Sequence, residues 1–163
     1  MSVVVGIDNG VSGAIACLSK SNKVIPMPIF FIKTRKGKKR DYNVFQIVKT
    51  LKKSKATHVF IEAAHSMPKQ GVVSTFNTGR GYGLIEGIVA ALGYKYTIVR
   101  AVVWQKIMLE GFDCDTKTAS VAVAKKIFPN VSLLATNRSK KDNNGLSDAL
   151  LIAEYGRRQL EET

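Results

Sequence analysis

Three acidic residues stand where folding could bring them together. Asp8 and Glu62 each end a short apolar run, VVVGID and THVFIE, and Asp148 lies at the start of the last predicted helix, in its first turn. Carboxylates at adjacent strand ends can converge and share Mg²⁺, which takes oxygen ligands. Two such ions about 3.5–4 Å apart can activate a water molecule and stabilise the leaving oxygen in phosphodiester hydrolysis. The pattern therefore indicates a two-metal hydrolytic site.

Each acid taken alone has a simpler explanation as a helix cap or a solvated turn. Asp148 is the most open to this alternative, because acids favour the N-terminal turns of helices. The joint placement of all three, each beside an apolar strand or helix, is what favours a shared site.

The charge of the chain indicates a polyanionic partner. With 25 Lys and Arg against 12 Asp and Glu, the formal net charge is +13 over 163 residues, which favours nucleic acid over a membrane surface. An ordinary solubilising surface mixes both signs, whereas these bases come in two blocks: Lys33, Arg35, Lys36, Lys38, Lys39 and Arg40, then Arg138, Lys140 and Lys141. Two separate basic loops fit an extended phosphate backbone better than one small anion.

Rival phosphate-binding motifs are absent or incomplete in the sequence. The chain contains no GxxxxGK[ST] string, which excludes a P-loop. Gly79 and Gly81 precede a helical segment, but the third glycine of a dinucleotide fingerprint would fall at Leu84. A nucleotide site of either kind is not expected.

Secondary structure is predicted from the spacing of the apolar residues. Short apolar runs bounded by turn residues predict strands at 2–8, 13–18, 23–32, 57–62 and 94–99. Helical periodicity predicts helices at 44–51, 84–92, 102–109, 116–127 and 146–160. Asp41 is the predicted N-cap of the first helix. The basic segment 33–40 is predicted to be a loop, segment 67–78 a loop leading into a helix, and segment 136–144 a third loop.

This order of elements predicts the fold class. Three early strands joined by turns, followed by helix–strand alternation, predict an α/β fold with a mixed five-stranded sheet and helices on both faces, as in the ribonuclease H-like architecture. No repeat or domain boundary is evident, so residues 1–163 predict a single domain. Segment 84–92 is apolar all round and should be largely buried; the face with Ile85, Gly87 and Ala91 could meet a twofold mate.

No segment predicts export or membrane insertion. The apolar run 24–32 is too short to span a bilayer and is interrupted by Pro26 and Pro28. The first apolar run of the chain is interrupted by Asp8 before any cleavage-like site, so a signal peptide is not expected. The two cysteines, Cys17 and Cys114, have no metal-ligand spacing. A soluble, unprocessed protein in a reducing cytosol is expected.

Short strings along nearly the whole chain, apart from 33–40, carry a family resemblance. They are, in order, GIDNG at 6–10, SGAIA at 12–16, FIE at 60–62, MPKQG at 67–71, GRGYG at 79–83, WQK at 104–106, TK at 116–117 with Ser120, IFP at 127–129 and GLSDALLIAEYGRR at 145–158. The last string is the most specific. Together they resemble the RuvC-type Holliday junction resolvases, most of all their phage-encoded and organellar branch.

The resemblance implies a homodimeric endonuclease, dependent on Mg²⁺ or Mn²⁺, on the ribonuclease H-like fold. Such enzymes bind four-way DNA junctions and make two symmetric nicks in DNA recombination and repair. Asp8, Glu62 and Asp148 match three of the family's metal-binding acids. The cytoplasm of a bacterial or phage-infected cell is the implied compartment, with an organelle matrix or a nucleus left open.

The fourth family position departs from the pattern. Members usually carry Asp or His just before the glycine that precedes the last helix, and Asn144 stands there. An amide offers one neutral oxygen to a metal but no charge. Two hypotheses follow: Asp142 reaches into the site from the loop, or Asn144 is an inactivating change, so that the chain binds junctions without cutting them.

The resemblance also implies contacts with DNA. Lys117, at the start of a predicted helix, matches a phosphate contact near the scissile bond, with an ordinary exposed lysine as the alternative. Lys69 and Arg80 can pair with phosphates, and Gln70 can contact a base edge or a sugar. The basic blocks add Lys36, Lys38, Lys39, Arg40, Lys140 and Lys141.

Aromatic and loop residues near Glu62 have alternative interpretations. His65 and Met67 lie where related resolvases insert a side chain at the point of strand exchange, although a lone loop histidine is more often only solvated. Tyr82 and Trp104 are interpreted as core or interface aromatics, and Phe76 is ambiguous.

Three classes of function compete at this stage. The leading one is a structure-selective DNA endonuclease, and the second is a non-catalytic junction-binding protein. The third is a fragment of an actin-like ATPase, because GIDNG also resembles a phosphate-binding turn, but 163 residues leave no room for a second lobe.

Overall fold

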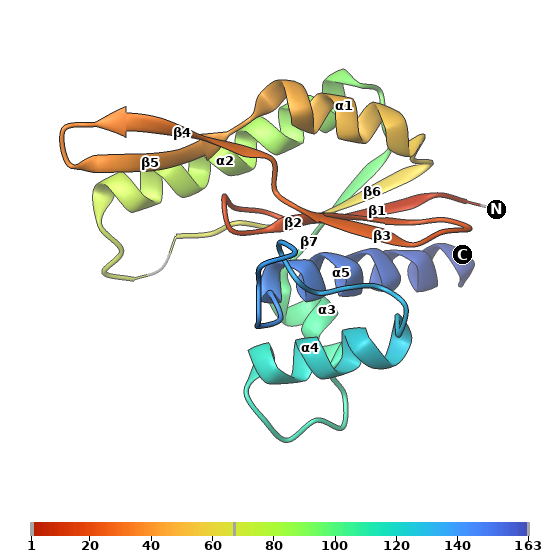
Figure 1. The fold of residues 1–163 in the computed structure, drawn as a ribbon. Coiled ribbons are helices and arrows are strands. Elements are labelled where there is room, and N and C mark those ends of the chain that lie inside the picture. Colours follow the sequence, from red (N-terminus) through yellow and green to blue (C-terminus); the bar gives the residue numbers. More distant parts are fainter. Residues whose placement is uncertain (1, 67, 163) are drawn as a thin grey trace.

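A mixed five-stranded sheet forms the centre of the computed structural model, which describes residues 2–66 and 68–162 (Figure 1). The strands lie in the order β3-β2-β1-β6-β7. Their bounds are β1 Val4–Asp8, β2 Ala14–Leu18, β3 Lys23–Pro26, β6 His58–Glu62 and β7 Tyr96–Val99. The first three pair antiparallel, and β1, β6 and β7 run parallel. The predicted five-stranded mixed sheet is confirmed.

Helices cover both faces of this sheet, as predicted. Side chains that alternate along a strand point to opposite faces, so Val5 and Ile7 pack under α1 (Val44–Ser54) and α2 (Val72–Ala91), whereas Val4 packs on α5 (Asn144–Glu161). The helices α3 (Ala101–Met108) and α4 (Thr116–Ile127) pack against α5 on its side of the sheet (Figure 1).

The close approach of α5 to β1 depends on Gly6. A Cβ atom at this position would overlap the carbonyl oxygen of Ala149 and the amide nitrogen of Ala153, so any larger residue would push the helix away from the strand. Asp148 precedes Ala149 in the chain. The contact at Gly6 therefore brings Asp148 to the strand that ends in Asp8.

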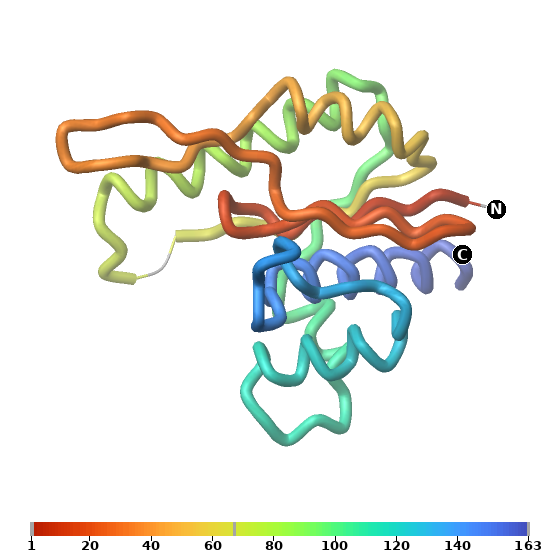
Figure 2. Tube along the Cα trace, viewed as in Figure 1, coloured from red at the N-terminus to blue at the C-terminus, as the bar shows by residue number. Residues whose placement is uncertain are grey.

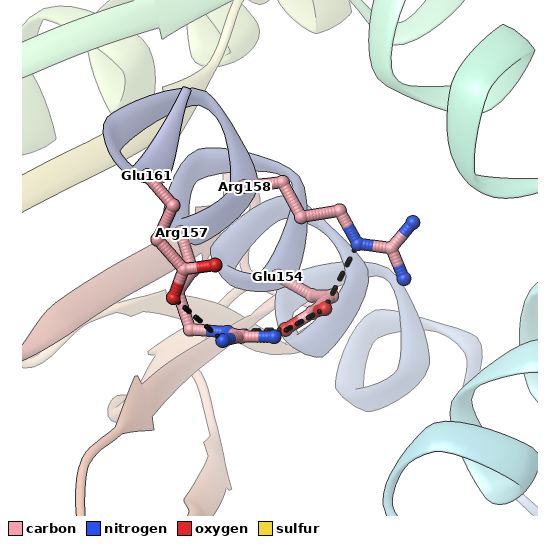
Figure 3. Close-up of polar contacts among 4 residues, drawn as sticks. All are labelled: Glu154, Arg157, Arg158 and Glu161. Carbon is pink, nitrogen blue, oxygen red and sulfur yellow. Dashed lines mark hydrogen bonds and ion pairs between the residues drawn. The ribbon is translucent and has the colours of Figure 1, made fainter. Parts of the chain in front are cut away.

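The far half of α5 contains an ion-pair network around one buried carboxylate. The Glu154 side chain is 3% exposed and accepts hydrogen bonds from Arg157 Nε and Nη2 at 2.8 Å and from Arg158 Nε at 2.9 Å. Figure 3 shows Arg157 and Arg158 both bonded to Glu154, with Glu161 bonded to the remaining guanidinium nitrogen of Arg157, Nη1. These contacts satisfy a carboxylate that is almost wholly removed from solvent.

The segment 23–42 differs from the prediction. In place of one strand at 23–32 followed by a loop, β3 ends at Pro26, and β4 (Ile29–Thr34) and β5 (Gly37–Tyr42) form a separate antiparallel hairpin. Pro28 interrupts the run because proline has no N–H to donate to a neighbouring strand. The hairpin was missed because its exposed lysines carry no alternating burial pattern. In Figures 1 and 2 it extends beyond the sheet beside the first half of α2.

Three helix starts also differ from the prediction. Asn43, not Asp41, caps α1, and its side chain accepts a hydrogen bond from the amide of Gln46 at 3.1 Å. α2 already begins at Val72, inside the segment predicted to be a loop, and α5 begins at Asn144 rather than Leu146. Asp148 consequently lies in the second turn of α5 and not in the first. In the described part of the chain, no helix is long and apolar enough to cross a membrane.

Candidate active site

Three carboxyl groups converge at one edge of the sheet. Ile7 and Ile61 are paired in the parallel strands β1 and β6, so the next residues, Asp8 and Glu62, end these strands side by side. The charges of Glu62 and Asp148 both act on Asp8. The fold thus brings together the three acids that the sequence singled out.

The environment of Asp8 and Asp148 favours their protonated forms. Burial, then the charges of Glu62 and Asp148, and then the hydrogen bond to Glu62 raise the pKa of Asp8 well above its ordinary value. Burial raises the pKa of Asp148 to about 6; the charge of Glu62 adds to this, while the Ser120 hydroxyl and the Lys117 charge oppose it. Like charges held together in a low dielectric attract a cation.

Two buried side chains from neighbouring helices position these acids. Trp104 of α3 is 0% exposed, and its Nε1–H donates to Glu62 Oε1 at 2.9 Å. Ser120 of α4 is 1% exposed; its hydroxyl donates to Asp148 Oδ1 and lies 3.0 Å from the hydroxyl oxygen of Ser147. Glu62 and Asp148 are therefore each oriented by a hydrogen bond from a buried side chain.

Neither role was predicted. Trp104 is a core aromatic, as expected, but its indole N–H was not considered. The signal was available, because a buried tryptophan needs an acceptor for that group. Ser120 belonged to the family resemblance without a stated role.

The donor set fits a hard divalent cation. All three acids offer oxygen, and Asn9 Oδ1, beside Asp8, is buried without a hydrogen-bond partner among the described residues. Within residues 2–66 and 68–162, no three Asp, Glu, His or Cys side chains lie close enough to hold one ion together. Mg²⁺ is usually held by one or two carboxylates together with waters and substrate phosphates, so pairs of these acids meet the requirement.

The Asn144 side chain is held through its amide nitrogen. Its Nδ2 donates to the backbone carbonyl of Lys117 at 2.8 Å, which ties the start of α5 to the start of α4. Asp142, the proposed substitute, forms an ion pair with Lys125 at 2.7 Å. Both side chains are thus engaged in contacts between the last loop, α5 and α4.

A cleft of about 970 Å³ opens beside Asp8. It lies between the β1–β2 turn, the base of the hairpin and α2, and its lining includes the predicted DNA-binding residues Lys39, Arg40 and Arg80. Arg80 pairs with Asp41 at 2.7 Å, and Lys39 donates to Asn77 at 3.3 Å. The hydrogen bond from Arg80 is the main reason that the pKa of Asp41 is lowered. These contacts fix the hairpin to α2 and hold cations next to the acids.

The other predicted DNA contacts lie outside the lining of this cleft. Lys117 is exposed in the first turn of α4, close enough for its charge to act on Asp148. Gln70 Nε2 donates to Ser74 Oγ at 2.9 Å and to Thr78 Oγ1 at 3.3 Å. The rest are exposed: His65 and Lys69 between β6 and α2, Lys36 and Lys38 on the hairpin, and Lys140 and Lys141 before α5. Met67 lies outside the described residues.

Solved structures of known proteins resemble this chain. Neither a protein-family model nor a curated protein sequence matches it. The RuvC structure of Thermus thermophilus superimposes with a TM-score of 0.58 at 14% identity over 96% of each chain. T. thermophilus RuvC in complex with a Holliday junction substrate gives 0.59 at 12% identity, covering 98% of this chain and 96% of that one.

The yeast mitochondrial Holliday junction resolvase Ydc2 gives a TM-score of 0.52 at 15% identity, covering 99% of this chain and 82% of that chain. At such identities the likeness shows the fold alone. The chain has the RuvC variant of the ribonuclease H-like fold, as the sequence resemblance implied.

Proposed function

We propose, starting from the RuvC fold, that the chain is a metal-dependent endonuclease that cuts branched DNA, four-way junctions in particular. The observation that carries the proposal is the convergence of Asp8, Glu62 and Asp148, two with raised pKa, beside a cleft lined with cations. An oxygen donor set with excess negative charge beside a polyanion-binding surface suits metal-assisted phosphodiester hydrolysis. RuvC of T. thermophilus, solved with a Holliday junction substrate, supports the choice of substrate.

Asp8, Glu62 and Asp148 would hold Mg²⁺ or Mn²⁺, with two ions in each active site. Bound ions of this kind lower the pKa of a water molecule and neutralise charge on the leaving oxygen. The residues of the chain orient the ligands: Trp104 fixes Glu62, and Ser120 fixes Asp148. Because the pKa values of Asp8 and Asp148 are raised, metal binding would release protons.

The residues proposed to contact DNA fall into three groups around this centre. Lys39, Arg40 and Arg80 line the cleft with Asp8, where they would hold the phosphates on either side of the reacting one. Lys117 acts on Asp148 from α4 and would contact a phosphate near the scissile bond. More distant contacts would come from His65, Lys69, Gln70, Lys36, Lys38, Lys140 and Lys141. Each phosphate neutralised on duplex DNA would add about −0.9 to the slope of log K against log salt.

A homodimer would supply two such centres, one for each of the two symmetric nicks. Ile85 cannot meet a mate, because it is 0% exposed in the core. The exposed face of α2 instead begins with Val72 and Phe76, which are 85% and 68% exposed, and continues through small residues. A Cβ would meet nothing at Gly79, Gly83 and Gly87. Helical glycines cost about 1 kcal/mol each and suit a close helix–helix contact.

A junction-binding protein without hydrolysis is the second candidate. The Asn144 amide donates to a backbone carbonyl where the resemblance expects a metal ligand. A chain of that kind would keep the basic cleft and would hold junctions equally well with and without Mg²⁺.

Cleavage of an end-labelled four-way junction in Mg²⁺ tests the proposal. We expect paired nicks from the chain itself, lost in Asp8→Asn at unchanged junction affinity. Asn144→Asp and Asn144→Ala separate the roles of position 144, since both lose the bond to Lys117 but only Asp adds charge. A rate gain confined to Asn144→Asp would assign the position to the metal site. Binding without cleavage by the chain and by Asn144→Asp would favour the second candidate.

A further inference from the structure

The outer face of the β4–β5 hairpin presents an aromatic ring among cations. The strand register places Phe31 opposite Arg40 and Lys33 opposite Lys38. Because cross-strand partners share a face and side chains alternate along each strand, these four side chains stand together. Phe31 is 63% exposed, and this face carries no acidic residue along β4 and β5.

The opposite face of the hairpin is held by α2. Asp41 pairs with Arg80, and Lys39 bonds to Asn77, which lies one helical turn before Arg80. Phe30 and Ile32 share this face by alternation and are less exposed than Phe31, at 45% and 39%. The Phe31 face meets α2 only at its base, where Tyr42 is 6% exposed and lies against Gly81. Farther out, Phe31, Lys33, Lys38 and Arg40 are all exposed.

The Phe31 face continues from the candidate active site. Tyr42 and Arg40 follow one another on this face of β5, and both line the cleft that contains Asp8. Neighbouring side chains on one face of a strand are about 7 Å apart, twice the rise per residue. Phe31 and Arg40 stand one such step out from Tyr42, and Lys33 and Lys38 stand two steps out.

We propose that this face binds an unpaired nucleotide next to the cut strand, with its base stacked on Phe31 and its phosphates held by Arg40, Lys38 and Lys33. The inference rests on the proposed function for its choice of DNA as the polyanion. An exposed ring flanked by cations is the arrangement that binds single strands, since every base has a face to stack. Paired bases hide these faces inside the duplex, so the site favours unpaired DNA at a branch.

The charge of the face argues against a second copy of the chain as its occupant. A twofold contact through the Phe31 face would place Arg40, Lys38 and Lys33 of both copies against one another. Like charges brought together at an interface are unfavourable. A polyanion removes this repulsion, and the aromatic ring then gains a flat partner.

Tryptophan fluorescence tests the stacking directly. Trp104 is the natural tryptophan of the chain and is 0% exposed, so both variants share its background signal. We would compare Phe31→Trp with Phe45→Trp, because Phe45 is 89% exposed on α1, outside the hairpin and the cleft. We expect a short oligothymidylate to quench the indole of Phe31→Trp saturably, and a blunt duplex to quench it far less. Equal quenching in both variants, or by both DNAs, would overturn the inference.

Affinity for the same oligothymidylate gives a second measurement. Phe31→Ala should weaken binding about tenfold, or about 1.4 kcal/mol, while Phe31→Tyr keeps the ring and should bind nearly as the parent chain does. Phe45→Ala is the matched control and should change nothing. A shift in oligomeric state with Phe31→Ala would assign the face to a second copy and would overturn the inference.

Junction cleavage separates the two proposals. If the chain fails to cut junctions but Phe31→Ala still loses affinity for oligothymidylate, the stacking site stands without the proposed function. If the chain cuts junctions and Phe31→Ala binds oligothymidylate unchanged, the stacking site is wrong and the proposed function stands.

Discussion

The helix α5 buries two carboxyl groups, Asp148 in its second turn and Glu154 in its second half, and their surroundings differ in charge. Burial alone would raise the pKa of Glu154, but the hydrogen bonds and charges of Arg157 and Arg158 hold it below its ordinary value. Burial raises the pKa of Asp148 to about 6, and the neighbouring charge of Glu62 adds to the rise. Glu154 therefore has positive counter-charges on its own helix, whereas Asp148 has a further negative charge, that of Glu62, beside it.

This difference separates a structural acid from a functional one. Removing a carboxylate from water is costly unless cations and hydrogen bonds replace the water. At Glu154 the sequence provides them one turn along the same helix. At Asp148 and Asp8 it provides further acids, an arrangement that costs stability in the metal-free protein and that a bound cation would relieve. Local rules are broken in this way mostly at functional sites.

Asp8→Asn should break the acid cluster with the largest effect. Loss of one metal-binding carboxylate should lower the cleavage rate by on the order of 10³ or more, while affinity for an end-labelled junction stays close to that of the parent chain. The same variant should raise the melting temperature of the metal-free protein, because it removes a buried charge. A variant that unfolds at the assay temperature would show that Asp8 is structural.

Asp148→Asn should stabilise the metal-free protein near neutral pH. Since the folded-state pKa of about 6 lies above the ordinary value of 3.8, the folded form keeps its proton longer than the unfolded form does. Stability is then lost as the pH rises through this window, by at most roughly 3 kcal/mol at about 1.4 kcal/mol per unit. Urea unfolding in EDTA from pH 4 to 8 should show a flatter pH slope for the variant; an unchanged slope would contradict the prediction.

The double variant Arg157→Ala with Arg158→Ala should make Glu154 resemble Asp148, as a buried acid without a positive counter-charge. It leaves Glu154 buried without a counter-charge, and we expect a loss of about 2–3 kcal/mol in the free energy of unfolding at pH 7. Lys125→Ala is the control, because it breaks a more exposed ion pair with Asp142 and should cost at most about 1 kcal/mol. Equal losses of stability in the two variants would contradict the prediction that buried Glu154 depends on its counter-charges more than the exposed pair does.

Trp104→Phe should have the smallest effect of these four variants. It keeps a buried ring but removes the N–H that fixes Glu62, and loss of such a supporting contact weakens metal binding by about tenfold. Calorimetric titration with Mn²⁺ would measure this change without DNA. Glu154→Gln changes a buried acid of α5 outside the acid cluster and serves as the control. We expect it to leave the Mn²⁺ affinity unchanged.

The fold and the acids were predictable because local patterns encode them. Apolar runs gave the strands, and the carboxyl ends of neighbouring parallel strands placed Asp8 beside Glu62. The supporting contacts were not predictable in this way. Trp104 lies 42 residues from Glu62, and Ser120 lies 28 residues from Asp148, so only the packing of α3 and α4 brings them together.

The hairpin was missed for a different physical reason. Its strands are exposed on both faces, so Lys38 and Lys39 need not alternate with apolar residues, and alternation is the main strand signal in a sequence. The exposed aromatic residues beside them fit a surface that is stabilised by α2 rather than by burial in the core.

The contact at Gly6 has a consequence for how such a chain can evolve. Where α5 meets β1, one backbone rests on another, so the separation between the helix carrying Asp148 and the strand ending in Asp8 does not depend on the size of any intervening side chain. Apolar residues elsewhere in the two cores can then drift, and repack around their substitutes, without altering the spacing of the acids. A fold built in this way tolerates wide sequence divergence while the acids keep their relative positions.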